Sequence, residues 1–218
     1  METPALCFFD VDHTITQHST GKYFAFKAVK AGYIQPRALM SIPLFYLKYR
    51  LGEITDRDLE REFSAFGGVR RDTLEELAER VFTRKIAGDI FPGARSLIES
   101  FQDRGIEVVI ATSSLDLVIK PLACFLGIKT VLASSLEYNN GICTGRFRGK
   151  LYFGENKRRE ALDFLESRGI QPEHCAFYSD SIHDLPLLEA VGESVVVNPD
   201  LRLRRYAKKN GWKIIRFR

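Results

Sequence analysis

Two aspartates one residue apart, Asp10 and Asp12, stand directly behind the apolar run Ala5–Phe9. The run has the composition of a buried strand, and side chains two positions apart on an extended chain point to the same side. Two carboxylates held that close repel each other unless a cation or a shared proton relieves the repulsion. The pair therefore predicts a divalent metal site, two carboxylates with different acid–base roles, or both.

A second acidic stretch, Ser179–Asp184, follows another strand-like run. Asp180 is expected at the strand end, and Asp184 in the first turn of the next helix, where the dipole favours a negative charge. If the two strands are neighbours, Asp10, Asp12 and Asp180 converge, and carboxylate oxygens are the ligands that Mg²⁺ prefers. If Asp180 or Asp184 is considered by itself, helix capping is a sufficient explanation for it. Both stretches at strand ends of one sheet favour a functional site.

Two weaker signals accompany the acidic stretches. A third apolar run ends in Thr112-Ser113-Ser114 and opens a predicted helix, so that hydroxyl and backbone N–H groups are available to a phosphate. An ordinary helix cap gives the same pattern. Lys157 stands at the start of another predicted helix, which disfavours a cation unless an anion is close by. Taken alone, a solvated lysine beside two arginines is the simpler interpretation.

The order of strand-like and helical runs predicts how these residues are positioned. Strand-like runs recur at 5–9, 106–111, 130–133, 175–179, 194–197 and 213–217. Helical patterns fill most of the intervals, at 94–104, 115–126, 155–168 and 183–190. Apolar strands that alternate with helices indicate an α/β fold, a Rossmann-like, doubly wound parallel sheet with helices on both faces. Ligands bind beyond the carboxyl ends of the strands in such sheets.

The segment from 20 to 88 breaks this alternation. It holds helical patterns at 22–31, 37–50, 56–66 and 72–85, separated by glycines and Pro36. We expect a helical cap domain over residues 19–87, inserted into a catalytic core made of 1–18 and 88–218. A turn sequence at Asn139-Asn140-Gly141, flanked by β-prone runs, predicts a hairpin within 135–150.

Composition excludes several classes of protein. The apolar fraction of 45% and the charged fraction of 28% over 218 residues are typical of a soluble globular protein with a substantial core. The net charge of +4 permits an anionic substrate and does not demand nucleic acid. The apolar stretch 38–47 is too short to span a membrane. Scattered cysteines without a CxxC and the lack of a signal peptide lead us to expect a reducing, cytoplasmic location.

The four patterns, taken in chain order, resemble the signature motifs of a known protein family. Asp10-Val11-Asp12-His13-Thr14, Ala111–Ser114, the helix-start Lys157 and Ser179–Asp184 are similar to the four signature motifs of the haloacid dehalogenase superfamily of phosphatases. The stretches 179–181 and 184–188 most resemble the phosphoserine-phosphatase-like branch. That superfamily places a helical cap between its first two motifs, where this chain has its helical segment. The four motifs together are specific for the superfamily and not for a substrate.

The resemblance implies catalytic and metal-binding roles for the aspartates. Asp10 is then the nucleophile that forms an aspartyl-phosphate. Asp12 is the general acid for the leaving alcohol and afterwards the base for water, and its backbone carbonyl binds Mg²⁺ together with Asp10 and Asp180. Asp184 supports this metal site without direct contact.

The resemblance also implies a phosphate-binding role for three further residues. Thr112 and the backbone of Ser113 bind the phosphoryl group, and Lys157 neutralises Asp10 and the transferring oxygens. His13 departs from the glycine common at its position in the superfamily. We expect its ring to pack at the turn, with a contact to the cap or the substrate as the alternative.

The substrate implied is a small phosphorylated metabolite, phosphoserine-like or another phosphorylated alcohol. Phosphoserine phosphatases carry an acid shortly after the first motif, and Ile15–Thr20 has none. Their cap also carries a Met-Pro-Phe stretch followed by a substrate-binding arginine, and residues 52–59 do not contain that stretch. The basic, aromatic cap leaves open a phospholipid or lysophospholipid head group, although helix-spaced aromatics usually form a core. A phosphotransferase with the same intermediate also stays open, as does the oligomeric state. A purely regulatory module is disfavoured, because all four reactive positions hold competent residues.

Overall fold

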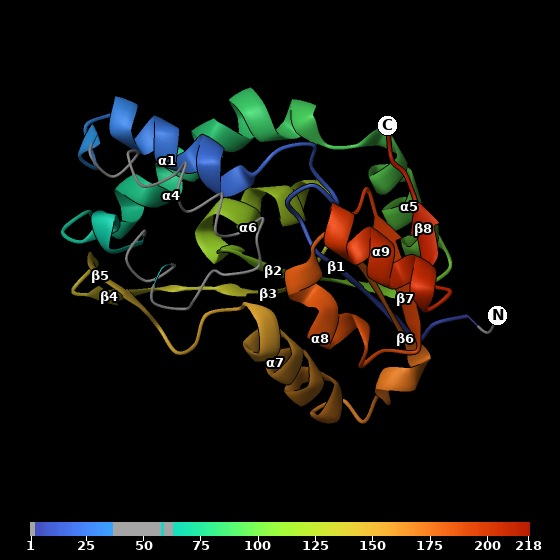
Figure 1. Ribbon diagram of the computed structural model, residues 1–218. Helices are drawn as coiled ribbons and strands as arrows, with labels where there is room; N and C mark the ends of the chain where they lie inside the picture. The colour runs from blue at the N-terminus through green and yellow to red at the C-terminus, as the bar shows by residue number, and fades with distance from the viewer. Residues whose placement is uncertain (1–2, 37–57, 59–62) are drawn as a thin grey trace.

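The computed structural model describes residues 3–36, 58 and 63–218, and its centre is one parallel sheet (Figure 1). Six strands lie in the order β3-β2-β1-β6-β7-β8, and every neighbouring pair is parallel. They are β1 (Leu6–Phe9), β2 (Glu107–Leu115), β3 (Thr130–Ser134), β6 (Cys175–Ser179), β7 (Glu193–Val197) and β8 (Lys213–Ile215). The predicted α/β fold with a parallel sheet is confirmed.

The central strand, β1, is buried along its whole length and has a neighbour on each side. Phe9 aligns with Ile110 of β2 and with Tyr178 of β6. Because the strands are parallel, the residues that follow them leave the sheet at the same edge. The register therefore aligns Asp10 with Ser179, the residue before Asp180, so that both aspartates lie at the carboxyl edge.

Helices cover both faces of the sheet, and alternate residues of β1 face the two layers. The ring of Phe9 contacts Phe101 of α5 on one face, and the ring of Phe8 contacts Phe164 of α7 on the other, each at 6.3 Å between ring centroids. The first layer also holds α6, and the second also holds α8 and α9. Their bounds are α5 (Pro92–Asp103), α6 (Asp116–Phe125), α7 (Gly154–Glu166), α8 (Leu185–Leu188) and α9 (Leu201–Lys209), with short turns η5 (Pro172–His174) and η6 (Ile182–Asp184).

A helical insertion separates β1 from α5, as predicted. Its described elements are α1 (Thr20–Lys30), η2 (Ser64–Phe66), α4 (Arg71–Val81), η3 (Phe82–Ile86) and η4 (Ala87–Asp89). Both α1 and α4 pack against each other and against α6 (Figure 1). Three of the predicted features lie outside the described residues: the helix at 37–50, most of the helix at 56–66 and the apolar stretch 38–47. No helix in the described part of the chain is long and apolar enough to cross a bilayer.

The predicted hairpin is confirmed as β4 (Leu136–Asn139) and β5 (Ile142–Phe147). Asn140 and Gly141 both have positive φ, as a tight hairpin turn requires. The hairpin bonds to the insertion, because the Cys143 N–H donates to the carbonyl of Val69 and the Gly68 N–H donates to the carbonyl of Cys143, each at 2.8 Å. It thereby ties the helical insertion to the sheet.

Two predicted boundaries are wrong. The strand expected to stop at Ala111 continues to Leu115, and the pairing of β2 with β3 shifts register between Thr112 and Leu115. The helix that follows starts at Asp116, so the three hydroxyls end a strand and do not open a helix. The helix expected over 183–190 is the 3-10 turn η6 followed by the short α8, which has Pro186 in its first turn.

Candidate active site

Asp10 follows β1 and is buried, with 6% of its surface exposed. Its backbone N–H donates to the carbonyl of Tyr178 at 2.9 Å, which continues the sheet pairing by one residue. Lys157 reaches it from the first turn of α7, and the Lys157 Nζ lies 3.0 Å from the Asp10 Oδ1. Lys157 is itself only 2% exposed. A buried ammonium at a helix N-terminus is costly unless it is paired, and Asp10 provides the pairing.

A second carboxylate holds the same ammonium. The Asp184 Oδ1 lies 2.7 Å from the Lys157 Nζ, and the Asp184 Oδ2 accepts a hydrogen bond from the Ser179 hydroxyl at 2.6 Å. Asp184 ends the 3-10 turn η6, directly before α8, and does not lie in the first turn of a longer helix as predicted. Its contacts match a supporting role, because it fixes the lysine that faces Asp10.

The site concentrates negative charge in a buried volume. Burial raises the pKa of Asp10 to about 7; Lys157 opposes this rise, and the carboxylates of Asp184 and Asp12 add to it. Burial, followed by the charges of Asp10 and Asp184, raises the pKa of Asp180 well above its ordinary value. Burial acts to lower the pKa of Lys157, but the two carboxylates beside it outweigh that effect and raise the pKa. The site therefore holds three buried carboxylates, and the buried ammonium of Lys157 contacts two of them, Asp10 and Asp184.

This charge balance and the donor set fit a divalent cation. Within residues 3–36, 58 and 63–218, no three His, Cys, Asp or Glu side chains are grouped so as to hold a metal ion. The metal ligands predicted from the sequence include only two carboxylates, those of Asp10 and Asp180, together with the backbone carbonyl of Asp12. Mg²⁺ usually keeps several waters and binds one or two protein carboxylates, so such a set suits it. The assignment of these ligands stays a prediction.

Asp12 has different partners from Asp10. The backbone N–H and the hydroxyl of Thr20 donate to the Asp12 Oδ1 at 2.9 and 2.7 Å. The Ser114 hydroxyl lies 3.5 Å from the Asp12 Oδ2 and 3.1 Å from the Thr20 hydroxyl. The first turn of α1 and the end of β2 thus hold the carboxylate that is predicted to move the proton. Sequence reasoning missed Thr20, because a threonine at a helix start carries no distinguishing signal.

Two of the three predicted phosphate-binding residues, Thr112 and Ser113, lie near the end of β2, the strand beside β1. Thr112 is 1% exposed, and its hydroxyl accepts a hydrogen bond from the Ser114 N–H at 3.2 Å. Ser113 is half-buried. Their position at the carboxyl edge agrees with a phosphate-binding role, which stays a prediction.

His13 lies in the turn after the first motif, at a positive φ of 62°. This left-handed conformation is natural for glycine and is tolerated by histidine better than by most residues. The His13 Nδ1 lies 2.8 Å from the carbonyl oxygen of Gln17, four residues along the same loop. The contact agrees with packing at the turn.

Asp200 is a further residue of the site that sequence reasoning missed. Its N–H donates to the carbonyl of Asp180 at 2.9 Å, and its Oδ2 accepts from the Ile182 N–H at 2.9 Å. Its Oδ1 caps α9. Asp200 therefore holds the loop that carries Asp180 through hydrogen bonds on both sides of Ser181. The available signal was its place between the apolar run of β7 and a helix, the pattern that identified the other two acidic stretches.

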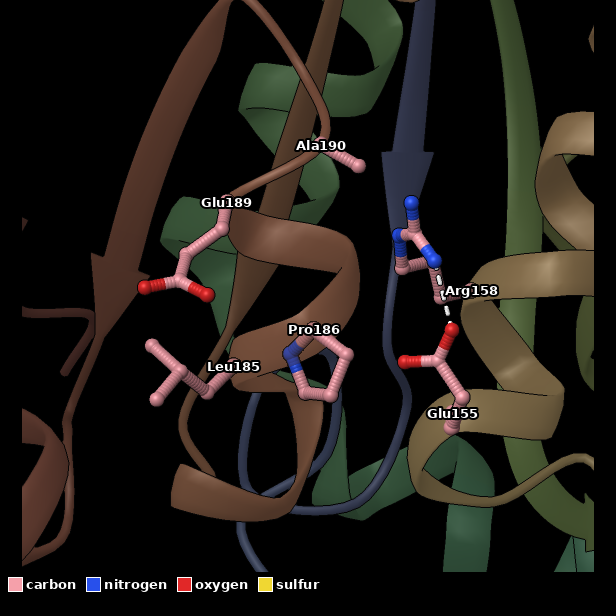
Figure 2. A pocket seen from close by; sticks show the side chains of 6 residues that line it. All are labelled: Glu155, Arg158, Leu185, Pro186, Glu189 and Ala190. Carbon is pink, nitrogen blue, oxygen red and sulfur yellow. Dashed lines mark hydrogen bonds and ion pairs between the residues drawn. The ribbon is translucent and has the colours of Figure 1, made fainter.

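A surface hollow of about 350 Å³ lies between α7 and α8 (Figure 2). Figure 2 shows Arg158 and Glu155 on α7, paired at 2.5 Å, across from the side chains of α8. The full lining is Glu155, Arg158, Leu185, Pro186, Glu189 and Ala190. The lining contains neither Lys157 nor any of the five aspartates described above, so the hollow is separate from the carboxylate site.

Comparison with known proteins assigns the family. The model of haloacid dehalogenase-like hydrolases matches residues 7–189. Phosphoserine phosphatase SerB1 of Mycobacterium tuberculosis is 31% identical over 223 residues, which cover 100% of this chain and 72% of the relative. Histidinol-phosphatase of Neisseria meningitidis serogroup C is 29% identical over 219 residues, which cover 98% of this chain and 99% of the relative.

A solved structure supports the same assignment. The crystal structure of a protein with unknown function from Bordetella pertussis Tohama I superposes with a TM-score of 0.88 at 26% identity, covering 98% of this chain and 99% of the other. The resemblance inferred from the four motifs is confirmed. The chain belongs to the haloacid dehalogenase-like hydrolases, in their phosphoserine-phosphatase-like branch.

Proposed function

We propose that this phosphatase hydrolyses a small phosphomonoester through a covalent aspartyl-phosphate on Asp10, with Mg²⁺ as its metal. The observation that supports the proposal most is the buried Asp10 at the carboxyl end of β1, 3.0 Å from the ammonium of Lys157. A phosphate dianion approaches an anionic carboxylate only where positive charge offsets the repulsion. Lys157 supplies part of that charge, and the excess of carboxylates leaves room for a cation.

The first step transfers the phosphoryl group to the protein. An oxygen of Asp10 attacks phosphorus, the new O–P bond forms, and the bond from phosphorus to the leaving alcohol breaks. Asp12 gives its proton to the leaving oxygen, while Thr112 and the backbone of Ser113 hold the phosphoryl oxygens. Lys157 keeps Asp10 in place and offsets the charge on the transferring oxygens.

The second step returns Asp10 to its starting state. Asp12, now a carboxylate, takes a proton from water as the water oxygen attacks phosphorus. The O–P bond to Asp10 breaks, which releases inorganic phosphate and leaves Asp12 protonated. Thr20 and Ser114 contact Asp12 and hold it in one position for both transfers. Splitting the hydrolysis into two displacements lowers the barrier of each.

Mg²⁺, when bound, supplies positive charge to the phosphoryl oxygens. We propose that Asp10, Asp180 and the carbonyl of Asp12 hold it, and that Asp184 acts through Lys157. We also propose that residues 19–87 form the cap over a core of 1–18 and 88–218.

The substrate class that we propose is a small phosphorylated alcohol. Two of the relatives carry the names phosphoserine phosphatase and histidinol-phosphatase, so O-phosphoserine and histidinol phosphate are the first compounds to test. The missing acid in Ile15–Thr20 makes phosphoserine the weaker of the two.

The experiment that tests the proposal is phosphate release from p-nitrophenyl phosphate, O-phosphoserine, histidinol phosphate and a lysophospholipid, with Mg²⁺ or with a chelator. We expect release that needs Mg²⁺ and that is lost in Asp10→Asn. Asp103→Asn, a change at an exposed position of α5, is the matched control and keeps full activity. Activity in Asp10→Asn, or no release from any substrate by folded protein, contradicts the proposal.

A further inference from the structure

We propose that the outer face of the helical insertion binds the surface of an anionic phospholipid bilayer. The proposal goes beyond hydrolysis at Asp10 and does not depend on it. A second surface hollow, of about 230 Å³, lies between the C-terminal halves of α1 and α4. Figure 1 shows these two helices at the end of the molecule opposite α9 and the two chain termini. None of the residues that line the hollow is acidic, and four are cations: Lys27, Lys30, Arg80 and Arg84.

Most of the positive charge in this basic hollow is not neutralised by the protein. Within residues 3–36, 58 and 63–218, one of the four cations forms an ion pair: Arg80, which lies 3.6 Å from Glu76. A helix C-terminus favours a cation on either helix, but the dipole does not explain why two helices place their cations around one hollow. A hollow lined by one sign of charge concentrates the field and attracts ions of the opposite sign. The basic hollow therefore fits a phosphate group.

The same hollow also presents apolar surface. Leu77 and Val81 of α4 line it together with the cations, and they are only 4% and 1% exposed. Its volume is below the range of about 300–1,000 Å³ for pockets that enclose a drug-sized ligand, so it suits one head group. A phosphodiester head group that continues into acyl chains combines negative charge with apolar surface. The lining offers a counterpart to both.

An exposed aromatic ring stands beside the basic hollow. Phe26 is 58% exposed, and Lys30 follows it four residues later on α1, so the two side chains are neighbours on the helix surface. A single exposed apolar side chain needs no explanation. An aromatic ring next to a basic surface, however, is the combination by which a helix binds the interface of an anionic bilayer. Free phosphate would use the cations alone, and Phe26 therefore favours a bilayer.

Sedimentation of the full chain with lipid vesicles tests the proposal. One set of vesicles is phosphatidylcholine alone, and in the other set a third of the lipid is phosphatidylglycerol. Phosphatidylglycerol is a phosphodiester and not a substrate for hydrolysis of phosphomonoesters, so its binding reports the surface of the insertion. We expect wild type to bind the anionic vesicles at least about 10-fold more tightly at low salt. High salt is expected to remove this preference, because it screens exposed charges.

Variants of the insertion locate the contact. A cation near an anionic surface contributes about a 5-fold change in affinity, so Lys30→Gln/Arg84→Gln is expected to bind the anionic vesicles about 25-fold more weakly. Phe26→Ser removes the ring that enters the interface and is expected to weaken binding by about 5- to 15-fold, with an unchanged dependence on salt.

The controls change side chains of the same kinds at the opposite end of the molecule. Lys208→Gln/Lys209→Gln removes two exposed cations of α9, and Leu201→Ser removes an exposed apolar side chain of the same helix. Both are expected to bind the anionic vesicles as wild type does. Because all the substituted side chains are exposed, every variant is expected to keep the melting temperature of wild type and its rate of phosphate release.

Several results overturn the bilayer proposal. Equal affinity of wild type for both kinds of vesicle does so, as does a loss of binding in Lys208→Gln/Lys209→Gln but not in Lys30→Gln/Arg84→Gln, which places the contact on α9. Binding that needs the cations but not Phe26 indicates a soluble polyanion such as an acidic peptide. Displacement by glycerophosphoglycerol, the head group without its chains, at the same phosphodiester concentration indicates a free anion.

The proposed hydrolysis fails in a different way. If wild type binds anionic vesicles through the basic hollow but releases no phosphate from any phosphomonoester, the reaction at Asp10 is wrong and the bilayer contact stands. If phosphate release is normal and the vesicles do not bind, the bilayer contact is wrong and the hydrolysis stands.

Discussion

The Nζ of Lys157 lies 3.0 Å from the Oδ1 of Asp10, and both side chains are almost fully removed from solvent. The two residues are 147 positions apart in sequence. Burying two charges costs desolvation energy that their attraction does not always recover. A pair in such a place is therefore weak evidence for stability and stronger evidence for a site in which a carboxylate must stay in position.

Lys157→Met removes the ammonium that Asp10 and Asp184 both contact. The remaining carboxylates lose their buried partner, so we expect the free energy of unfolding near neutral pH to fall by about 3 kcal/mol. Loss of a charge that stabilises the transferring oxygens lowers kcat by about 10²- to 10³-fold. Urea unfolding and phosphate release measure the two effects. Lys209→Met, at an exposed position of α9, is the control, and equal behaviour of the two variants would refute the role of Lys157.

Removal of the metal makes stability depend on pH. The raised pKa values of Asp10, about 7, and of Asp180 mean that the folded state binds more protons than the unfolded chain. The contribution of Asp10 to stability is complete below about pH 4 and is lost as pH rises through about 7, and that of Asp180 is likewise lost as pH rises through its raised pKa. We therefore expect metal-free protein to melt at a lower temperature at about pH 8 than at about pH 5.

Mg²⁺ reverses this loss, because it binds the deprotonated carboxylates. The rise in melting temperature on adding Mg²⁺ to chelator-treated protein is expected to be larger at about pH 8 than at about pH 5. Thermal melts with Mg²⁺ or with a chelator provide the comparison. An equal rise at both pH values would show that the cation does not bind these carboxylates.

Thr20→Val removes the hydroxyl that donates to Asp12 at 2.7 Å. A hydrogen bond to a charged group contributes about 1.5–3 kcal/mol, so we expect kcat to fall by about 10- to 100-fold with little change in KM. Thr20→Ser restores the donor and is expected to recover most of the rate. Thr83→Val, at an exposed threonine, is the control. If Thr20→Ser is no better than Thr20→Val, the hydroxyl does not position Asp12.

Much of this arrangement could be predicted from local patterns. The apolar runs of β1 and β6 are continuous and short, and Asp10 and Asp180 directly follow them, so parallel pairing alone brings these aspartates to one edge. Lys157 was identified only through the resemblance of the four motifs, because a cation at a helix start, taken alone, is more simply a solvated lysine.

What could not be predicted depends on contacts between distant segments. Thr20 meets Asp12 only because α1 turns back over the end of β2. The hairpin was expected from Asn140-Gly141, but its pairing with Val69 involves a residue far away in sequence. The extension of β2 to Leu115 goes with a register shift against β3, which no local sequence pattern predicts.

His18 and Asp89 join the two ends of the helical insertion. The backbone N–H of His18 donates to the Asp89 Oδ2 at 2.9 Å, and its Nδ1 lies 2.7 Å from the Oδ1. Asp89 is 8% exposed but the His18 side chain is 64% exposed, so the donors that Asp89→Ala leaves unpaired are partly open to solvent. We expect the variant to lose about 0.5–1.5 kcal/mol of unfolding free energy, the net contribution of a hydrogen bond.

A double-mutant cycle with His18→Ala isolates this contact. We expect a coupling energy of at least about 0.5 kcal/mol between His18 and Asp89 from urea unfolding. The exposed pair of Arg71 and Glu75, 2.8 Å apart, is the comparison, and its coupling is expected not to exceed about 0.5 kcal/mol. Simple additivity of His18→Ala and Asp89→Ala would rule out a joint contribution at this junction.

The most direct test of the central claim is to trap the phosphorylated residue. Protein mixed with substrate and Mg²⁺ is quenched in acid within one turnover, treated with borohydride and digested for mass spectrometry. Reduction of an aspartyl-phosphate converts that aspartate to homoserine, and we predict homoserine at position 10, none in Asp10→Asn, and inorganic phosphate as the product. Homoserine at another aspartate, or turnover without any modified aspartate, would contradict the account.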